Sequence, residues 1–467
     1  VQAVGDTGDV VVDTNQMRLH SIPPQSATTT QPKIATTLAF TTLPASPTTY
    51  GASVSVAARL TSPGVTDMHG RRVIFRLGRS SVSAMTAADG SVSAIVPVNV
   101  LPGSYQLRAS FAEDATARGS STEAPLVVEI APTTFESTTN IATVQYSDNV
   151  RLATLHTATG ELLRWQPIML SRTDLALGDV RRDVASFTDG VGDVRLDTMD
   201  FGGLAAGTYP IVAKFFGDVR FDAAMSGVFT VTVQKELATS EAPSPQQAGA
   251  VTFRSTVVQE GPPADRAPGD LTRAGITYTL KDEAGTTLQS GTATVAADGT
   301  WSFTRTVAPG VYTIAATITG DYFTGSGTTI AVAYDPTTFG TGGGTIVLGD
   351  TAVPVAARGK KANFGFNVKY KDGTSVPIGS LLFQLKEANI DLKATSFDWL
   401  SITPDGAGKR AEFQARATIN GSGSYVVRVI ARDLPTGDTF SIVVTDAGGT
   451  TVISASGTTG GGSIKVH

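Results

Sequence analysis

Leu101–Asp114 reads LPGSYQLRASFAED, and close variants of this stretch return three more times in the chain. The variants cover Leu204–Asp218, Val307–Asp321 and Asn420–Asp433. Each places a glycine two residues before a tyrosine, continues with apolar residues at every second position and ends on an aspartate. Apolar residues at every second position after a glycine turn are typical of a half-buried β-strand. The same strand is therefore expected once in each of four units.

The spacing of the repeated tyrosines indicates the size of each unit. The tyrosines are Tyr105, Tyr209, Tyr312 and Tyr425, and successive members lie roughly 100 residues apart. That interval is too long for a solenoid repeat of about 20 to 50 residues. It fits β-sandwich domains of about 100 residues in tandem. The predicted fold class is all-β, with tandem immunoglobulin-like β-sandwiches and a larger C-terminal β-sandwich.

Composition excludes several classes of protein. The 467 residues favour about two to four domains, and the tyrosine spacing favours four. The net charge of -5 comes from 36 basic and 41 acidic residues, so no basic field indicates a nucleic-acid partner. Cysteine is absent, which removes disulfides and thiol chemistry. No run of about 18 apolar residues predicts a membrane span.

The N-terminal segment, residues 1–32, is predicted to hold one strand and a linker. Val10–Val12 is the candidate strand, and the residues from Ser21 to Pro32 are rich in proline and threonine. A lone strand is not stable in water. It is therefore expected to pair with the first domain, with a domain upstream or with a neighbouring molecule.

The remaining predicted domains follow from the alternating patterns and the breaks between them. The immunoglobulin-like domains are placed at residues 33–130, 131–234 and 246–335, and the C-terminal sandwich at 345–467. A proline-rich break, Glu241–Pro245, is placed before the third domain. The glycine-rich run Gly340–Gly344 is interpreted as a hinge before the fourth.

The four tyrosines are predicted to have a structural role. In immunoglobulin-like sandwiches a tyrosine near the start of strand F bonds its hydroxyl back to the backbone at the E–F corner. All four tyrosines follow a glycine and head an alternating strand. The alternative is a surface aromatic that stacks on sugars. The shared position favours the tyrosine corner at Tyr105, Tyr209, Tyr312 and Tyr425.

At these residues the repeats resemble the bacterial Ig-like (Big) domains of exported and cell-surface proteins. The resemblance rests on Thr48–Val54 with Leu101–Asp114, and on Val307–Tyr312 with Thr319–Phe323. It covers roughly residues 33–335, and the second repeat departs from it in its first half. Residues 345–467 look like a β-module found behind such repeats. The resemblance implies the fold and an exported protein. The family includes adhesin stalks, surface-layer proteins and accessory modules of secreted enzymes.

The search for chemistry predicts no catalytic, cofactor-binding or metal-binding residues. The four histidines fall in separate segments, without the spacing of a metal site or a catalytic triad. The neighbouring carboxylates Asp282 and Glu283 are interpreted as solvated charges, because an acid/base pair needs a cleft. Calcium is kept as the alternative cofactor. A calcium site needs several oxygen ligands that converge on one point. Its candidate ligands are Asp6, Asp9, Asp13, Asp114, Asp218, Asp321, Asp433 and Asp438. The aspartates after strand F are instead expected to cap the following loop.

These patterns predict a non-catalytic structural or adhesive protein of the bacterial cell surface, shaped as a multidomain rod. The expected partners are other protein subunits or cell-surface glycans, and homo-oligomers or polymers are included. One alternative is a subunit of a surface layer or extracellular fibre that assembles by exchanging its N-terminal strand. The other is an accessory region of a secreted hydrolase.

Overall fold

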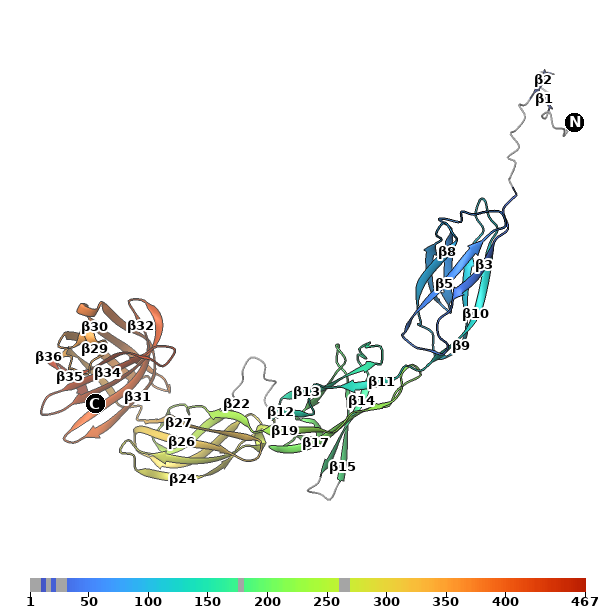
Figure 1. Ribbon diagram of the computed structural model, residues 1–467. Helices are drawn as coiled ribbons and strands as arrows, with labels where there is room; N and C mark the ends of the chain where they lie inside the picture. The colour runs from blue at the N-terminus through green and yellow to red at the C-terminus, as the bar shows by residue number, and fades with distance from the viewer. Residues whose placement is uncertain (1–9, 14–17, 22–31, 175–179, 260–268) are drawn as a thin grey trace.

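Four β-domains follow one another in chain order to form an elongated molecule (Figure 1). The computed structural model describes residues 10–13, 18–21, 32–174, 180–259 and 269–467. In that part of the chain the only helices are single 3₁₀ turns, at Asp200–Gly202, Leu271–Arg273, Val355–Ala357 and Lys386–Ala388. Among the described residues no helix has the length and apolar character needed to cross a membrane.

The first domain is a sandwich of two sheets. Its strand Ser53–Thr61 alternates buried and exposed residues, so that Val54, Val56 and Leu60 face the second sheet. One sheet has the order β3-β5-β8 and the other β4-β10-β9-β6-β7, which are the A-B-E and A′-G-F-C-C′ sheets of an immunoglobulin-like fold. The strands are β3 (Thr37–Thr42), β4 (Thr48–Thr49), β5 (Ser53–Thr61), β6 (Arg72–Leu77), β7 (Ser80–Met85), β8 (Ser91–Pro97), β9 (Gly103–Phe111) and β10 (Ser120–Glu129).

The second domain repeats this arrangement. Its sheets are β11-β13-β16 and β12-β19-β17-β14-β15, and the short β18 is added beside β17. In the first domain the first strand is divided, with β3 in one sheet and β4 in the other. The same division occurs here, because β11 joins one sheet and β12 runs parallel to β19 in the other. The strands are β11 (Thr133–Glu136), β12 (Ile141–Gln145), β13 (Asn149–Thr157), β14 (Pro167–Asp174), β15 (Val180–Phe187), β16 (Asp193–Asp197), β17 (Gly207–Phe215), β18 (Ala224–Met225) and β19 (Phe229–Gln234).

The third domain begins about ten residues earlier than predicted. Strand β20 (Glu236–Ser240) pairs with β22 and with β27, so it belongs to this domain and joins its two sheets. The proline-rich stretch Glu241–Pro245 is therefore not an interdomain break. It is the crossing that connects β20 to β21. Its prolines lack the N–H group that a strand inside a sheet would donate, so the chain is not paired there as a strand. The remaining strands are β21 (Gln246–Gln247), β22 (Gly249–Gln259), β23 (Gly275–Lys281), β24 (Thr287–Thr294), β25 (Thr300–Val307), β26 (Gly310–Thr319) and β27 (Phe323–Tyr334).

The fourth domain is larger, as predicted, and its facing layers come from one continuous sheet. Nine antiparallel strands follow the order β35-β34-β33-β32-β31-β30-β29-β28-β36. Strands β29 and β34 stand five places apart in this order, yet Phe364 and Phe440 stack with ring centroids 4.0 Å apart. The sheet therefore folds over a shared core. The strands are β28 (Phe339–Val347), β29 (Lys361–Tyr370), β30 (Pro377–Leu385), β31 (Ile390–Asp405), β32 (Gly408–Ile419), β33 (Ser422–Asp433), β34 (Thr439–Thr445), β35 (Thr451–Thr458) and β36 (Gly460–Val466).

The predicted hinge at Gly340–Gly344 is wrong, because these glycines lie inside strand β28. The strand pairs with β29 on one side and with β36 on the other. A Cβ on Gly342 would lie 2.8 Å from the Phe366 ring, and one on Gly462 would lie 1.9 Å from the Gly343 oxygen. The glycines are needed because the neighbouring strands approach β28 closely. The fourth domain therefore starts at Phe339 and not at residue 345.

The predicted N-terminal strand has a partner within its own segment. Strand β1 (Val10–Asp13) pairs antiparallel with β2 (Arg18–Ser21). The expectation of a single unpaired strand is therefore wrong. The predicted linker falls almost entirely outside the described residues.

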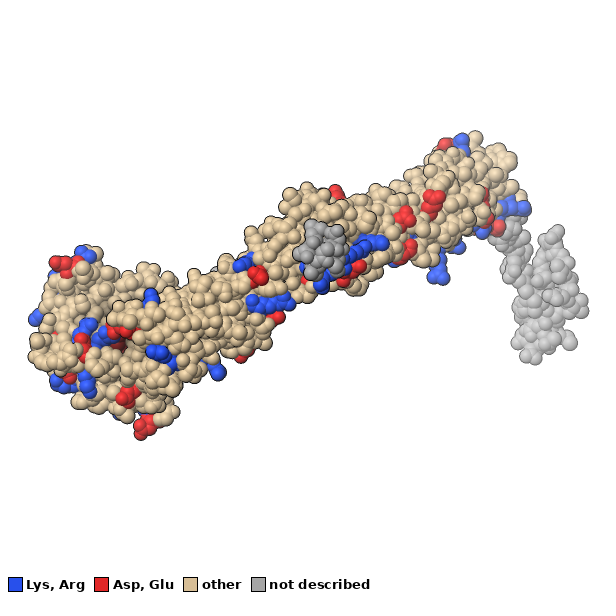
Figure 2. All heavy atoms as spheres, turned by 90° about the horizontal axis from the view of Figure 1, so that it is seen from below, with Lys and Arg blue, Asp and Glu red and all other residues tan. Residues whose placement is uncertain are grey.

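The all-β class and the tandem immunoglobulin-like sandwiches are confirmed by these sheet orders. Figure 2 shows the same line of domains from below, with acidic and basic side chains interspersed on that face.

Candidate functional sites at the corners, junctions and surface hollows

Three of the four predicted tyrosines have the geometry of a tyrosine corner. The Tyr105 hydroxyl donates to the Leu101 backbone oxygen at 2.7 Å. Tyr209 donates to the Ala205 oxygen at 2.8 Å, and Tyr312 to the Ala308 oxygen at 2.7 Å. Each bond therefore links the start of strand F to the carbonyl four residues earlier, at the connection from strand E.

Tyr425 lies in a different setting, and the corner predicted there is corrected. It follows the tight turn between β32 and β33, which are neighbours in one sheet. No corner between two layers exists at that point. In the described part of the chain its hydroxyl forms no hydrogen bond, although its ring packs against the fourth core. Gly423 lies inside β33 and has a positive φ of 77°, and a Cβ on it would lie 2.6 Å from Tyr425 Cε2, so this position requires glycine.

The junction between the first and second domains is built from aromatic rings and an arginine. Tyr50 follows strand β4, and its ring meets Phe221 of the second domain edge-on at 5.5 Å. The Arg220 guanidinium lies 5.9 Å from the Tyr50 ring centre and 5.1 Å from that of Phe221. Hydrogen bonding to Asp218, and then to Tyr50, outweighs burial and raises the pKa of Arg220. Such contacts hold the ends of the two domains together.

The junction between the second and third domains repeats this design. Tyr146 follows strand β12 and is fully buried, and its ring lies 4.9 Å from Tyr322 and 5.3 Å from Phe323. Arg273 lies 4.5 Å from the centre of the Tyr322 ring and donates to the Gly202 oxygen at 2.8 Å. The buried residues of the two domains form one continuous cluster across this junction. The two domains therefore share a core.

The junction between the third and fourth domains combines an apolar contact with an aromatic stack. Trp399 packs against Val311 and Val332. Tyr334 stacks on Tyr370 with ring centroids 4.1 Å apart. The Tyr370 hydroxyl donates to the Leu400 oxygen at 2.8 Å, and burial raises the pKa of that tyrosine.

An ion-pair cluster lies beside the same junction. Arg410 of the fourth domain pairs with Glu283 of the third domain and with Glu412, which is 1% exposed. Arg428 also pairs with Glu412. Glu283 is exposed, as expected of a solvated charge, and it also takes part in a charged contact between domains that the sequence did not indicate. Asp282 accepts a bond from the Thr286 backbone in a turn.

Several aspartates proposed as calcium ligands accept hydrogen bonds from the protein. Asp114 accepts from the backbone N–H groups of Thr116 and Ala117 and pairs with Arg71. Burial opposes its ionisation, but these bonds outweigh burial and lower the pKa of Asp114 to about 2. Asp218 caps its loop through Arg220 and Phe221.

The other calcium candidates are dispersed. Asp433 and Asp438 accept from the Val466 and Ile464 backbones, and Asp321 lies at the second junction. Asp6 and Asp9 are outside the described residues, as is the Asp13 side chain. No group of three metal-binding side chains occurs in the part of the chain that the structure describes.

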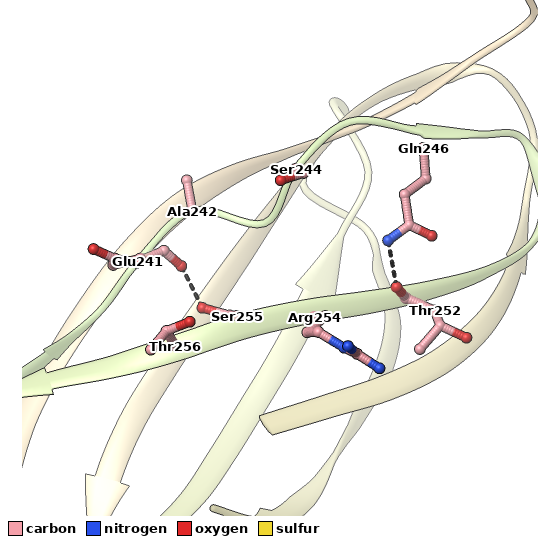
Figure 3. Close-up of a pocket in the computed structure, with 8 residues that line it drawn as sticks. All are labelled: Glu241, Ala242, Ser244, Gln246, Thr252, Arg254, Ser255 and Thr256. Carbon is pink, nitrogen blue, oxygen red and sulfur yellow. Dashed lines mark hydrogen bonds between the residues drawn. The ribbon is translucent and has the colours of Figure 1, made fainter. Parts of the chain in front are cut away.

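Figure 3 shows an open hollow in the third domain, between the crossing that includes Glu241 and Ser244 and the strand β22. Its volume is about 510 Å³. Gln246 Nε2 donates to the Thr252 oxygen at 2.6 Å, and the Ser255 hydroxyl donates to the Glu241 oxygen. These polar groups bond to the chain itself and hold the crossing on the sheet.

Sequence reasoning did not identify the junction residues. A weak signal was present, because Tyr50 and Tyr146 occupy the same position after strand A′. Phe221 and Phe323 both follow an aspartate that ends the repeated stretch.

Comparison with known proteins gives no family assignment. No protein-family model matches the chain, and no curated protein matches it. Among solved structures, a tetra-tandem repeat in the extending region of a large adhesion protein is 17% identical, with a TM-score of 0.25. That match covers 91% of this chain and 99% of the other.

Two further matches are bacterial adhesins. A structure from a 1.5-MDa bacterial ice-binding adhesin is 12% identical, with a TM-score of 0.18, and covers 65% of this chain and 98% of the other. A Ca²⁺-stabilized adhesin of an Antarctic bacterium is 14% identical, with a TM-score of 0.17, and covers 91% of this chain and 99% of the other.

Proposed function

We propose that the chain is a non-catalytic rod of the bacterial cell surface, exported from the cell, which separates and presents adhesive or structural elements. In this proposal the first three domains are bacterial Ig-like domains. The observation that carries it is the construction of the junctions. All three are closed by packed aromatic side chains, and two domains share one buried cluster.

Packed junctions favour a fixed, extended shape over a flexible string. Contacts between domains in one chain are often small and permit relative motion. Here each junction adds an arginine contact or an ion pair to its aromatic contact. A rod made in this way keeps its two ends at a fixed separation. The expected partners, other protein subunits or cell-surface glycans, would bind at surfaces that the rod holds apart.

The assembly alternative, a surface layer or fibre that exchanges N-terminal strands, has less support. Its motivation was an unpaired strand, and β1 already pairs with β2. Removing residues 1–21 and measuring assembly by light scattering separates the two functions. A rod that acts as a spacer stays in the same oligomeric state after the deletion, whereas strand exchange requires assembly to be lost.

Small-angle X-ray scattering tests the extended shape. Four domains with strands of about ten residues span roughly 150 Å, because each strand residue adds about 3.3 Å and loops add the remainder. A rod of that length has a radius of gyration of about 43 Å, against about 23 Å for a compact chain of this size. A measured value near that of the compact chain would contradict the proposal.

A further inference from the structure

One sheet of the second domain presents apolar side chains to solvent. In strand β17 the residues between the buried Ile211, Ala213 and Phe215 point outward, because successive side chains lie on opposite faces of a sheet. The residues that pair with them on the neighbouring strands share this outer face. We call it the apolar face, and its apolar members are Ile141, Pro167, Met169, Ala185, Phe187, Pro210, Val212, Phe216 and Met225.

The largest side chains of the apolar face are open to solvent. Phe187 is 64% exposed, Phe216 is 57% exposed and Met225 is 71% exposed. Exposed apolar areas of more than a few hundred Å² mark interaction sites in soluble proteins. The edge strand β15 extends away from the line of domains, so another molecule can reach this sheet (Figure 1).

The corresponding face is polar in the other two immunoglobulin-like domains. In the first domain Met85 is exposed there, but Arg76, Arg108 and Glu123 are paired across the middle of the face. In the third domain the face consists mainly of hydroxyl side chains, namely Thr277, Thr279, Ser290, Thr292, Thr294, Thr317 and Ser326. The sandwich fold therefore does not require an apolar face at this place, and the second domain differs from its neighbours.

The apolar face also carries charges of both signs. Lys214 lies on β17 and Asp183 on β15, and β14 runs between these two strands. Lys214 Nζ lies 4.7 Å from the centre of the Phe216 ring, and among the described residues it has no ion-pair partner. Asp183 pairs with Arg181 of its own strand at 2.8 Å. The face thus offers a free cation on one side of β14 and a carboxylate on the other.

We propose that the apolar face binds the same face of a second copy of the chain, so that two molecules pair side by side at their second domains. A two-fold axis that lies in the interface and crosses β14 near Met169 brings Lys214 of each copy to Asp183 of the other. The apolar side chains of the two copies then cover one another. The charges of the face are complementary to those of a second copy, and this complementarity favours that occupant.

The apolar face is large enough for a stable dimer. Along the path β12-β19-β17-β14-β15 the strands lie about 4.8 Å apart, so the sheet is roughly 24 Å wide. Its longer strands have eight or nine residues and are therefore at least about 26 Å long. Two faces of about 600 Å² bury about 1,200 Å² in total, which is the lower end of the range for specific interfaces. We expect a Kd of about 10 µM.

This inference goes beyond the proposed function, because it says how two molecules associate. The two can fail separately. The mass in solution reports pairing whatever the shape of the chain. Scattering on a Val212→Arg variant, in which the centre of the face is charged, reports the shape of one copy.

The test is sedimentation velocity of the full chain at concentrations from about 1 to 100 µM. The wild type is expected to change from the mass of one chain to twice that mass, with a midpoint near the Kd of about 10 µM. Removal of residues 1–21 should leave this transition unchanged, because the pairing does not use the N-terminal strands.

Two variants introduce the residues that the neighbouring domains have at the same positions, so each is compatible with the fold. Val212→Arg copies Arg108 of the first domain, and Phe187→Thr copies Thr294 of the third. Each is expected to weaken pairing at least about tenfold, because it places a polar group in the interface. Ile95→Arg in the first domain is the matched control, since Ile95 is also 64% exposed, and it should pair as wild type. Thermal melts verify that all three variants are folded.

A charge exchange tests the orientation of the two copies. Lys214→Asp alone places a carboxylate against Asp183 of the other copy and should weaken pairing about tenfold. Addition of Asp183→Lys should return the Kd to within about threefold of the wild type, because the opposite charges then meet in exchanged positions. A double variant that pairs no better than Lys214→Asp would overturn the two-fold arrangement.

Three further results overturn the proposal. The first is a wild type that remains a monomer at 100 µM, roughly ten times the expected Kd, which would leave the face to a different partner or to none. The second is a dimer that Val212→Arg and Phe187→Thr both leave unchanged. The third is a mass that continues to rise beyond two chains, because a two-fold contact closes at the dimer.

Discussion

At the scale of single residues, a hydroxyl that reaches back four residues joins the start of strand F to the connection from strand E. Three domains contain this bond, at Tyr105, Tyr209 and Tyr312. The ring packs against the sandwich, so removal of the oxygen alone leaves the packing in place. The carbonyl then loses its protein donor, and this loss determines the energetic effect.

Phenylalanine at each corner is expected to lower the free energy of unfolding of that domain by about 0.5 to 1.5 kcal/mol. Tyr425→Phe should change the fourth domain by less than about 0.5 kcal/mol, because its hydroxyl has no partner to lose. Differential scanning calorimetry of the full chain, with hydrogen exchange to assign each transition, measures both effects. An equal loss at Tyr425 would contradict the distinction between corner and hairpin.

The Asp114 carboxylate makes the first domain sensitive to acid. The folded pKa of about 2 lies below the 3.8 of an unperturbed aspartate, so the native state favours the ionised form. The resulting stability is complete above about pH 4 and is lost as the pH falls toward 2. Because Asp114 is partly exposed, we expect the loss to be about 1 kcal/mol.

A thermal melt of wild type and Asp114→Asn at pH 6 and pH 2 measures this dependence. The variant should be less stable at pH 6 and should approach wild type at pH 2. A difference between the two proteins that is constant with pH would show that the charge of Asp114 does not contribute.

At the scale of strands, the sequence predicted most of the elements that carry alternating patterns. Strands such as β5 and β29 alternate apolar and polar residues, because each has one face in a core and one in solvent. The glycine run at 340–344 was misread because glycine usually marks turns, and no side-chain pattern remains to show burial. What makes it a strand is contact with Phe366 and with β36, which is distant in sequence.

The close approach of β28 and β36 predicts a severe effect of one methyl group. In Gly462→Ala the new Cβ would lie 1.9 Å from the Gly343 oxygen, so the two strands must separate. The expected loss is about 3 kcal/mol or more for the fourth domain, because backbone cannot move aside as a flexible side chain does. Urea denaturation followed by fluorescence measures the change.

Gly365→Ala is the matched control on the adjacent strand β29. Its Cβ would have no neighbour within 4 Å, and its φ is not in the left-handed region. The control should be within about 0.5 kcal/mol of wild type or slightly more stable. Equal losses in the two variants would refute the argument from close approach.

At the scale of the whole molecule, the number of domains was readable from the sequence and the junctions were not. The repeated Tyr105 stretch belongs to each domain separately, so it returns at a fixed interval. A junction needs two residues from different domains, such as Tyr50 and Phe221, and neither has a pattern of its own.

Trp399→Ala is expected to loosen the third junction while leaving both adjoining domains folded. The indole contacts Val311 and Val332 across the boundary, so its removal leaves the stack of Tyr334 on Tyr370 as the main contact. Because the chain has no cysteine, Thr287→Cys and Thr450→Cys provide two unique labelling positions. Single-molecule measurements give the distribution of energy-transfer efficiencies between dyes at these two positions. This distribution should be narrow in the wild type and broader in Trp399→Ala.

Phe187→Ala, which removes an exposed ring from the second domain, is the control and should keep the narrow distribution. An unchanged distribution in Trp399→Ala would show that the indole does not hold the third junction.

The parallel pairing of β12 with β19 has a consequence for a molecule under tension. These are an early and the last strand of the second domain, and five successive positions are paired, from Ile141↔Thr230 to Gln145↔Gln234. A pull on the two ends of the chain slides these strands past each other, so that all their bonds bear the load together. In the first domain the corresponding pair, β4 with β10, has only two positions. Under a stretching force the first domain should therefore yield before the second.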